Sequence, residues 1–194
     1  MTVLDKATRW EPMDRSGIEH LHVRTTTGGL VAQSVVVGTH NDAKYGIFYR
    51  VVLDANWAVR ELEINDTATD QKLVLSADGK GKWFDANGTH VAGLDGCIDI
   101  DISATPFTNT LPIRRLQLKH GAAQVLRVVY IPVPALKPVA VEQRYTCLQP
   151  NRLYRYEGLT SGFMAELSTD EDGFVEPPKS NTYQHPELVL ANKA

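Results

Sequence analysis

Three aspartates and two arginines lie within one short run of the sequence, LDGCIDIDISATPFTNTLPIRRL. Asp99 and Asp101 alternate with isoleucines, so an extended segment would place both carboxylates on one face. Arg114 and Arg115 follow a segment that returns the chain toward Asp95, and a guanidinium group can bind a carboxylate through paired hydrogen bonds. We therefore predict an ion pair between one of these arginines and one of the aspartates. Such a cluster can stabilise one end of a barrel or anchor the polar head of a ligand.

The same carboxylates could act as a general acid and a general base, because Asp99 and Asp101 are close enough to perturb each other's pKa values. Neighbouring arginines would keep both carboxylates ionised, which suits a structural role better than proton transfer. The chain has no GxSxG nucleophile motif, no phosphate-binding loop and no GxGxxG motif, so we expect no cofactor. His20 and His22 would share a strand face, but no third ligand is evident nearby, and we expect no metal site.

The composition is that of a globular protein. At 194 residues, with 43% hydrophobic and 22% charged residues, the chain is long enough for one domain with a substantial core. We expect that domain to span residues 1–175 and a C-terminal arm to span residues 176–194. The formal net charge of −3 and the scattered basic residues give no electrostatic case for nucleic acid or an anionic membrane as a partner. The oligomeric state stays open.

Two features of the sequence concern the compartment. The N-terminal residues lack the charged and apolar regions of a signal peptide, and no window has the apolar length of a transmembrane segment. Cys97 and Cys147 are too few and too far apart for a disulfide scaffold. We therefore expect a cytoplasmic protein with two reduced, unbridged thiols.

The elements that must position the charged cluster are short alternating segments separated by turns rich in Gly, Asn and Asp. Pro106 and Pro112 remove backbone donors, so Thr105–Pro112 is predicted to be an ordered loop, and residues 1–17 an irregular lead-in. The pattern predicts an all-β fold, an antiparallel and strongly curved sheet or open barrel with few or no helices. Besides the segment around Asp99, the main predicted strands span residues 18–24, 30–38, 45–54, 57–66, 71–77, 82–85, 124–132, 139–148, 153–157 and 163–169.

Four runs of the sequence carry a resemblance: the run quoted above, DANWAVRELEI and DGKGKWFD before it, and QRYTCLQPNRLYRYE after it. Together they resemble the glycolipid-binding family, first described as a domain of unknown function, over roughly Gly38 to Val175. The resemblance implies a mainly β, barrel-like fold similar to the bacterial lipoprotein localisation factors, with an apolar cavity. It also implies that the ligand is a lipid or glycolipid, and it brings no catalytic residues with it.

The leading functional hypothesis is therefore a binding protein in which apolar strand faces line a cavity and polar side chains form its mouth. One alternative is a cavity-type enzyme that uses Asp95, Asp99 or Asp101. Another is an interaction domain that binds no small molecule and presents an exposed sheet edge. The candidate ligand-binding residues are Trp57, Arg60, Asp99, Asp101, Arg114, Arg115, Tyr130, Tyr154 and Tyr156.

Overall fold

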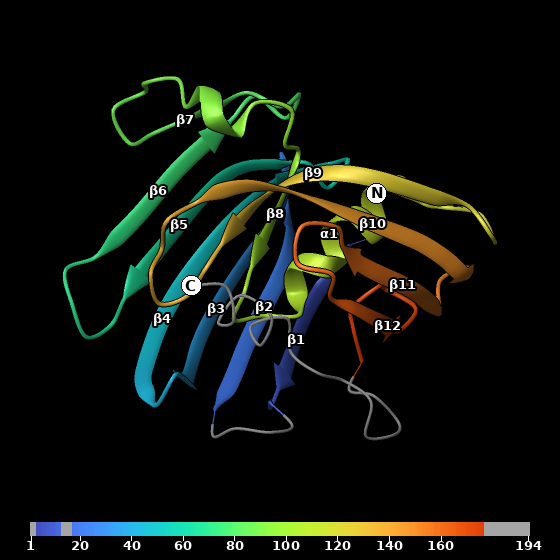
Figure 1. The fold of residues 1–194 in the computed structure, drawn as a ribbon, viewed down its shortest axis with the longest axis horizontal. Helices are drawn as coiled ribbons and strands as arrows, with labels where there is room; N and C mark the ends of the chain where they lie inside the picture. The colour runs from blue at the N-terminus through green and yellow to red at the C-terminus, as the bar shows by residue number, and fades with distance from the viewer. Residues whose placement is uncertain (1–2, 13–16, 177–194) are drawn as a thin grey trace.

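Two β-sheets form most of the computed structural model, which describes residues 3–12 and 17–176 (Figure 1). The first sheet is antiparallel and follows the chain order, with strands β1 Asp5–Trp10, β2 Ile18–Thr26, β3 Gly29–His40, β4 Ala43–Asp54, β5 Val59–Asp66, β6 Lys72–Ala77 and β7 Trp83–Phe84. The second sheet has the order β12-β11-β10-β9-β8, with strands β8 Asp99–Ile102, β9 Ala123–Ile131, β10 Val139–Gln149, β11 Leu153–Gly158 and β12 Met164–Ser168. The second sheet curls into a half-barrel, which confirms the predicted fold class.

Strand β1 corrects the predicted irregular lead-in. It pairs with β2 from Asp5 opposite Arg24 to Trp10 opposite Glu19. As an edge strand it is exposed at alternate positions and mainly half-buried between them, so it lacks the apolar alternation that marks the other strands. Its buried end is fixed by the Trp10 indole, whose Nε1 donates a hydrogen bond to the Val175 carbonyl at 2.8 Å.

The predicted loop at Thr105–Pro112 is also wrong, because most of this segment is helical. A 3-10 turn, η2, spans Phe107–Asn109, and the helix α1 spans Thr110–Leu116. Pro106 caps η2 and Pro112 lies in the first turn of α1, where backbone N–H groups need no acceptor within the helix. The two prolines therefore begin helical turns here instead of excluding them.

A parallel strand pair departs from the predicted antiparallel order. Strand β8 runs parallel to β9, with Asp99 opposite Val128 and Ile102 opposite Ile131. Parallel neighbours need a crossover connection, and η2 and α1 provide it. The connection places α1 inside the curve of the sheets, as Figure 1 shows.

Helix α1 and the turn before it fill part of the interior where an apolar cavity was expected. Phe107 and Leu111 belong to the larger core, which they share with side chains of the first sheet. Phe107 stacks against Tyr49, with ring centroids 6.5 Å apart, and it also contacts Phe174. Ile113, on another side of α1, belongs to a second core formed with β9, β10, β11 and β12. The helix thus separates two apolar cores.

Side-chain contacts join the edges of the two sheets. On one side, Lys6 Nζ of β1 binds the carboxylates of Asp170 at 2.6 Å and Asp172 at 2.8 Å. On the other side, Trp83 Nε1 donates a hydrogen bond to the carbonyl of Cys97 at 2.7 Å. Cys97 and Cys147 are both buried and free, so the prediction of unbridged thiols is confirmed.

Candidate functional site

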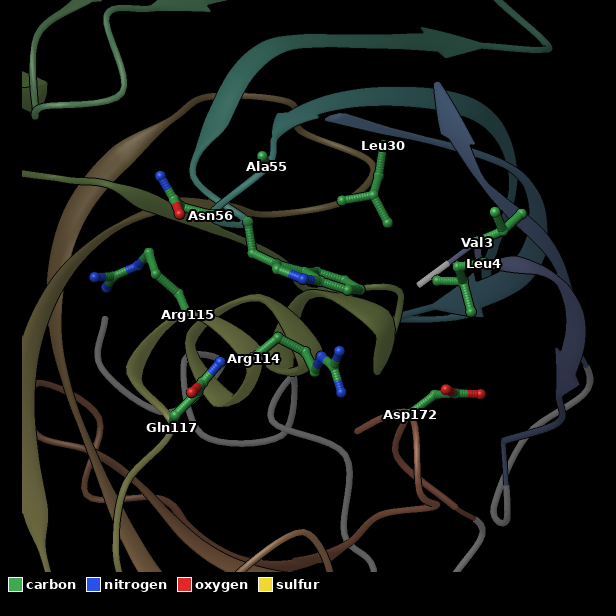
Figure 2. A pocket seen from close by; sticks show the side chains of 10 residues that line it. Val3, Leu4, Leu30, Ala55, Asn56, Arg114, Arg115, Gln117 and Asp172 are labelled. Atoms are coloured by element: carbon green, nitrogen blue, oxygen red, sulfur yellow. The ribbon is translucent and has the colours of Figure 1, made fainter. Parts of the chain in front are cut away.

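A hollow of about 270 Å³ opens between the C-terminal end of α1 and the turn that joins β4 to β5 (Figure 2). Apolar side chains stand on one side of it, where Figure 2 shows Val3, Leu4 and Leu30 together. The lining residues are Val3, Leu4, Leu30, Ala55, Asn56, Trp57, Arg114, Arg115, Gln117 and Asp172. Three residues of the predicted ligand-binding set, Trp57, Arg114 and Arg115, therefore meet at this place.

The turn from β4 to β5 holds Trp57 in an unusual backbone conformation. Asp54 Oδ1 accepts hydrogen bonds from the backbone N–H of Asn56 at 2.8 Å and of Ala58 at 3.1 Å. This arrangement gives Trp57 a φ of +68°, in the left-handed region that favours glycine. A side chain other than glycine in this region is typically strained by about 1 kcal/mol or more.

Within residues 3–12 and 17–176 the same turn occurs three more times, and each time glycine takes the left-handed position. Asp78, Asp85 and Asp170 each accept hydrogen bonds from the backbone N–H groups two and four residues later. The residues that correspond to Trp57 are Gly81, Gly88 and Gly173, with φ of +105°, +76° and +81°. The indole thus occupies a position whose backbone geometry calls for glycine. This difference is visible in the sequence, where the turn at Asp54 reads Asp-x-x-Trp and the equivalent turns read Asp-x-x-Gly. The prediction of Trp57 as a site residue did not depend on this difference.

Arg114 lies over the ring of Trp57, with the guanidinium carbon 5.2 Å from the ring centroid. Gly173 makes room for it, because a Cβ at that position would lie 2.8 Å from Arg114 Cδ. Within the described part of the chain, no carboxylate forms an ion pair with Arg114 and no acceptor takes a hydrogen bond from it. A cation with a fixed orientation and unused N–H donors therefore faces the hollow.

Arg115 has a different environment, although it is the next residue. Figure 2 shows the two side chains leaving α1 in different directions. Arg115 donates two hydrogen bonds to Asp99, from Nε at 3.0 Å and from an Nη at 2.6 Å, and the Asp99 side chain is only 1% exposed. Burial raises the pKa of Asp99, and the hydrogen bonds from Arg115 oppose that rise. The predicted arginine–aspartate pair is confirmed, and it fixes α1 to β8.

A second hollow, of about 470 Å³, shares Arg114 and Gln117 with the first. It also has two further groups that can carry positive charge, Lys119 and His120. None of the described residues around it is acidic; the full lining is Ile113, Arg114, Gln117, Leu118, Lys119, His120, Pro150, Asn151 and Gly173. Arg114 therefore stands where the two hollows meet.

Other residues of the predicted ligand-binding set lie away from these hollows. Arg60 is exposed and donates from Nε to the Ala77 carbonyl at 3.2 Å. Tyr154 and Tyr156 share a face of β11 as expected, but that face packs into the second core. Tyr130 is half-buried on β9, opposite Asp101 of β8.

Asp101 is half-buried and is not among the described residues that line these hollows. Its carboxylate accepts a hydrogen bond from Gln143 Nε2 at 2.5 Å and a longer one from the Thr108 hydroxyl at 3.4 Å. Burial raises the pKa of Asp101 to about 6, and hydrogen bonds from Gln143, Thr108 and Tyr156 oppose that rise. Asp95, the third aspartate of the run, pairs instead with His90 at 2.7 Å.

A buried carboxyl group that the sequence analysis missed lies on β2. Glu19 Oε1 accepts hydrogen bonds from the hydroxyls of Ser34 at 2.8 Å and Tyr49 at 2.6 Å. Burial raises the pKa of Glu19 to about 7, and the hydrogen bonds from neighbouring hydroxyls oppose that rise. The alternation of Glu19 with Leu21 and Val23, both fully buried, was a signal that could have placed it inside.

The described residues also bear on metal binding and on membrane spans. Among residues 3–12 and 17–176, no three His, Cys, Asp or Glu side chains gather so that they could hold a metal ion. His22 instead forms a pair with Asp5 at 2.6 Å. In the same part of the chain, no helix has the length and apolar character required to cross a bilayer.

Comparisons with known proteins agree with the fold. A family model described as "Putative glycolipid-binding" matches residues 7–180. The chain is similar to the crystal structure of a DUF1089 family protein from Pseudomonas aeruginosa, with 38% sequence identity and a TM-score of 0.75. That match covers 88% of this chain and 95% of the other. Comparison with curated proteins found no significant match. Because the family model spans most of the sequence, the chain belongs to the family that this model describes, as the resemblance in the sequence predicted.

Proposed function

We propose that this protein binds a lipid or glycolipid and that the polar head of the ligand occupies the hollow beside Trp57 and Arg114. The observation that carries the proposal is the Arg114 guanidinium over the ring of Trp57 in a hollow with an apolar side. The family's description supports a binding role. A pocket that combines apolar walls with a few fixed polar groups is the usual form of a small-molecule site.

Both parts of an amphiphilic ligand find matching groups here. Val3, at the edge of the hollow, is 81% exposed, and Leu4 and Leu30 lie beside it. An acyl chain laid on these side chains would gain roughly 0.8 kcal/mol for each CH₂ group that it buries. The side-chain amides of Asn56 and Gln117 can donate to and accept from sugar hydroxyls.

Native mass spectrometry of the purified protein, followed by solvent extraction, tests whether a lipid copurifies with it. A fluorescent fatty acid then provides a titration. Ala55→Trp places a large side chain at an exposed position of the hollow and should abolish saturable probe binding. Ala86→Trp is the matched control, since Ala86 is exposed at the equivalent position of the Asp85 turn, and it should bind the probe as the wild type does. Equal binding by both variants, or no binding by the wild type, contradicts the proposal.

The two alternatives have less support. The enzyme hypothesis needs a reactive carboxylate in a cavity, and neither of the two hollows that meet at Arg114 has Asp95, Asp99 or Asp101 among its described lining residues. The interaction-domain hypothesis needs an exposed sheet edge, and the side-chain contacts of Lys6 and Trp83 engage one residue on each of two edges.

A further inference from the structure

We propose that the ligand carries an anionic group, a phosphate or a carboxylate, which the Arg114 guanidinium binds where the two hollows meet. This inference rests on the proposed function and names the chemical class of the head group. It predicts that an acidic amphiphile binds more tightly than a neutral one with the same chain.

The first support is the way Arg114 is held. The guanidinium carbon lies over the Trp57 ring, 5.2 Å from its centroid, and the N–H donors at the edge of the guanidinium stay available. A planar fork of this kind matches the oxygen atoms of a phosphate or carboxylate and binds them through two parallel hydrogen bonds. Among the described residues, nothing occupies these donors.

The second support is the contrast with neighbouring charges, which are already paired. Arg115 is bound by Asp99, and Lys6 is bound by Asp170 and Asp172. Asp172 lines the first hollow, but its carboxylate is held by Lys6 at 2.8 Å and forms no ion pair with Arg114 within the described chain.

The third support is the charge of the second hollow. It is lined by Arg114, Lys119 and His120, and no acidic side chain is present among its described lining residues. An anion at Arg114 would therefore meet positive charge from this hollow and no opposing carboxylate there.

The fourth support is the strained position of Trp57. Three equivalent turns of the chain have glycine where this turn has tryptophan, so the turn itself does not require the indole. Side chains kept in sparsely populated backbone conformations cluster at functional sites. The role that the geometry assigns to Trp57 is to hold the guanidinium of Arg114 in one plane beside the hollow.

Calorimetric titrations below the micelle concentration test the proposal with three probes: decyl phosphate, decyl glucoside and inorganic phosphate. The wild type should bind decyl phosphate roughly tenfold or more tightly than decyl glucoside, because charge-assisted hydrogen bonds favour the anion. Arg114→Gln should remove that preference, so that it binds the two decyl probes with similar affinity. Arg50→Gln is the matched control: Arg50 lies on β4, pairs with Glu61 and lines neither hollow, so its loss should leave the preference intact.

Two further variants separate charge from geometry. Arg114→Lys keeps the charge but loses the planar fork, so it should retain only part of the preference for phosphate. Trp57→Gly suits the backbone of its turn and keeps Arg114, yet it should also weaken the preference because the guanidinium loses its platform. Thermal melts establish that each variant is folded before its binding is interpreted. If Trp57→Gly does not fold, Arg114→Lys still decides between charge and geometry.

The outcomes distinguish the two proposals. Equal binding of both decyl probes by wild type and Arg114→Gln overturns the anionic head group and leaves lipid binding standing. If neither decyl probe binds, both proposals fail. If inorganic phosphate binds as tightly as decyl phosphate and Arg114→Gln abolishes both, anion recognition by Arg114 stands and the lipid proposal fails.

Discussion

The stability of the protein should fall as pH rises from about 5 to 8, and Glu19 should cause much of that fall. The group is 3% exposed, and burial raises its pKa from 4.5 to about 7. At a pH between these two pKa values, the Glu19 carboxyl group is protonated in the folded state and ionised in the unfolded state. Stability is therefore highest below the unfolded-state pKa and is lost as pH rises through the folded-state pKa.

The magnitude follows from the size of the shift. One pKa unit corresponds to about 1.4 kcal/mol, so the shift of Glu19 from 4.5 to about 7 lowers the free energy of unfolding by roughly 2 to 3 kcal/mol between pH 5 and 8. Asp101 acts with the same sign in a lower window, because burial raises its pKa from 3.8 to about 6. Glu19→Gln keeps an acceptor for Ser34 and Tyr49 but cannot ionise, so this variant should lose the Glu19 share of the pH dependence.

Urea denaturation of the wild type and Glu19→Gln at pH 5, 6, 7 and 8 measures the effect. The variant should be more stable than the wild type at pH 8, and the difference should shrink toward pH 5. Glu61→Gln is the control, because Glu61 is exposed and its replacement should leave the pH dependence of the free energy of unfolding unchanged. If the free energy of unfolding changes with pH in the same way for wild type and Glu19→Gln, the reasoning is refuted.

Further predictions concern the ion pair and the thiols. Arg115→Ala should destabilise the protein by about 3–5 kcal/mol, because it leaves the Asp99 carboxylate buried without its partner; Arg114→Ala should cost only about 1 kcal/mol, the value typical of a cation–π contact made by a half-buried side chain. Thermal melts compare the two variants. Equal losses of stability would contradict the assignment of the Asp99 ion pair to Arg115. Cys97 and Cys147 should resist alkylation in the native protein, and mass spectrometry after denaturation without a reductant should show two modified thiols. Finding a disulfide there would contradict the structure.

The strands and the central ion pair could be predicted from the sequence because both depend on local patterns. Alternation over residues 45–54 specified β4, which spans Ala43–Asp54. The pairing of Arg115 with Asp99 followed from a chain that returns to its starting point within a short run. In each case the interacting groups lie close in the sequence or repeat with the period of a strand.

The helix and the edge strand could not be predicted in the same way. Pro112 is a helix breaker at most positions, and only its place in the first turn of α1 makes it compatible with the helix. The edge strand β1 has weak apolar alternation of its own; it is specified by its pairing with β2 and by the hydrogen bond from Trp10 to Val175, a contact distant in the sequence.

Some candidate site residues belong to the second core, away from the two hollows. Tyr154 and Tyr156 share a strand face, but period-two alternation alone does not tell which face is covered. Here that face is covered in part by Ile113 of α1, which directly follows the segment Thr105–Pro112 that was predicted to be a loop. The grouping of Trp57 with Arg114 likewise needed the position of the helix, although the unusual residue of the turn was visible in the sequence.

The three tryptophans provide the most direct test of the ligand site. The indole N–H groups of Trp10 and Trp83 donate to the carbonyls of Val175 and Cys97, whereas Trp57 lines the hollow. In a ¹⁵N NMR titration with decyl phosphate and decyl glucoside, each indole N–H gives its own signal, and Trp57→Gly assigns the one from the hollow. We predict that the Trp57 signal shifts and saturates while the signals of Trp10 and Trp83 stay in place. A Trp57 signal that does not move, or three signals that move together, would contradict a ligand site at this hollow.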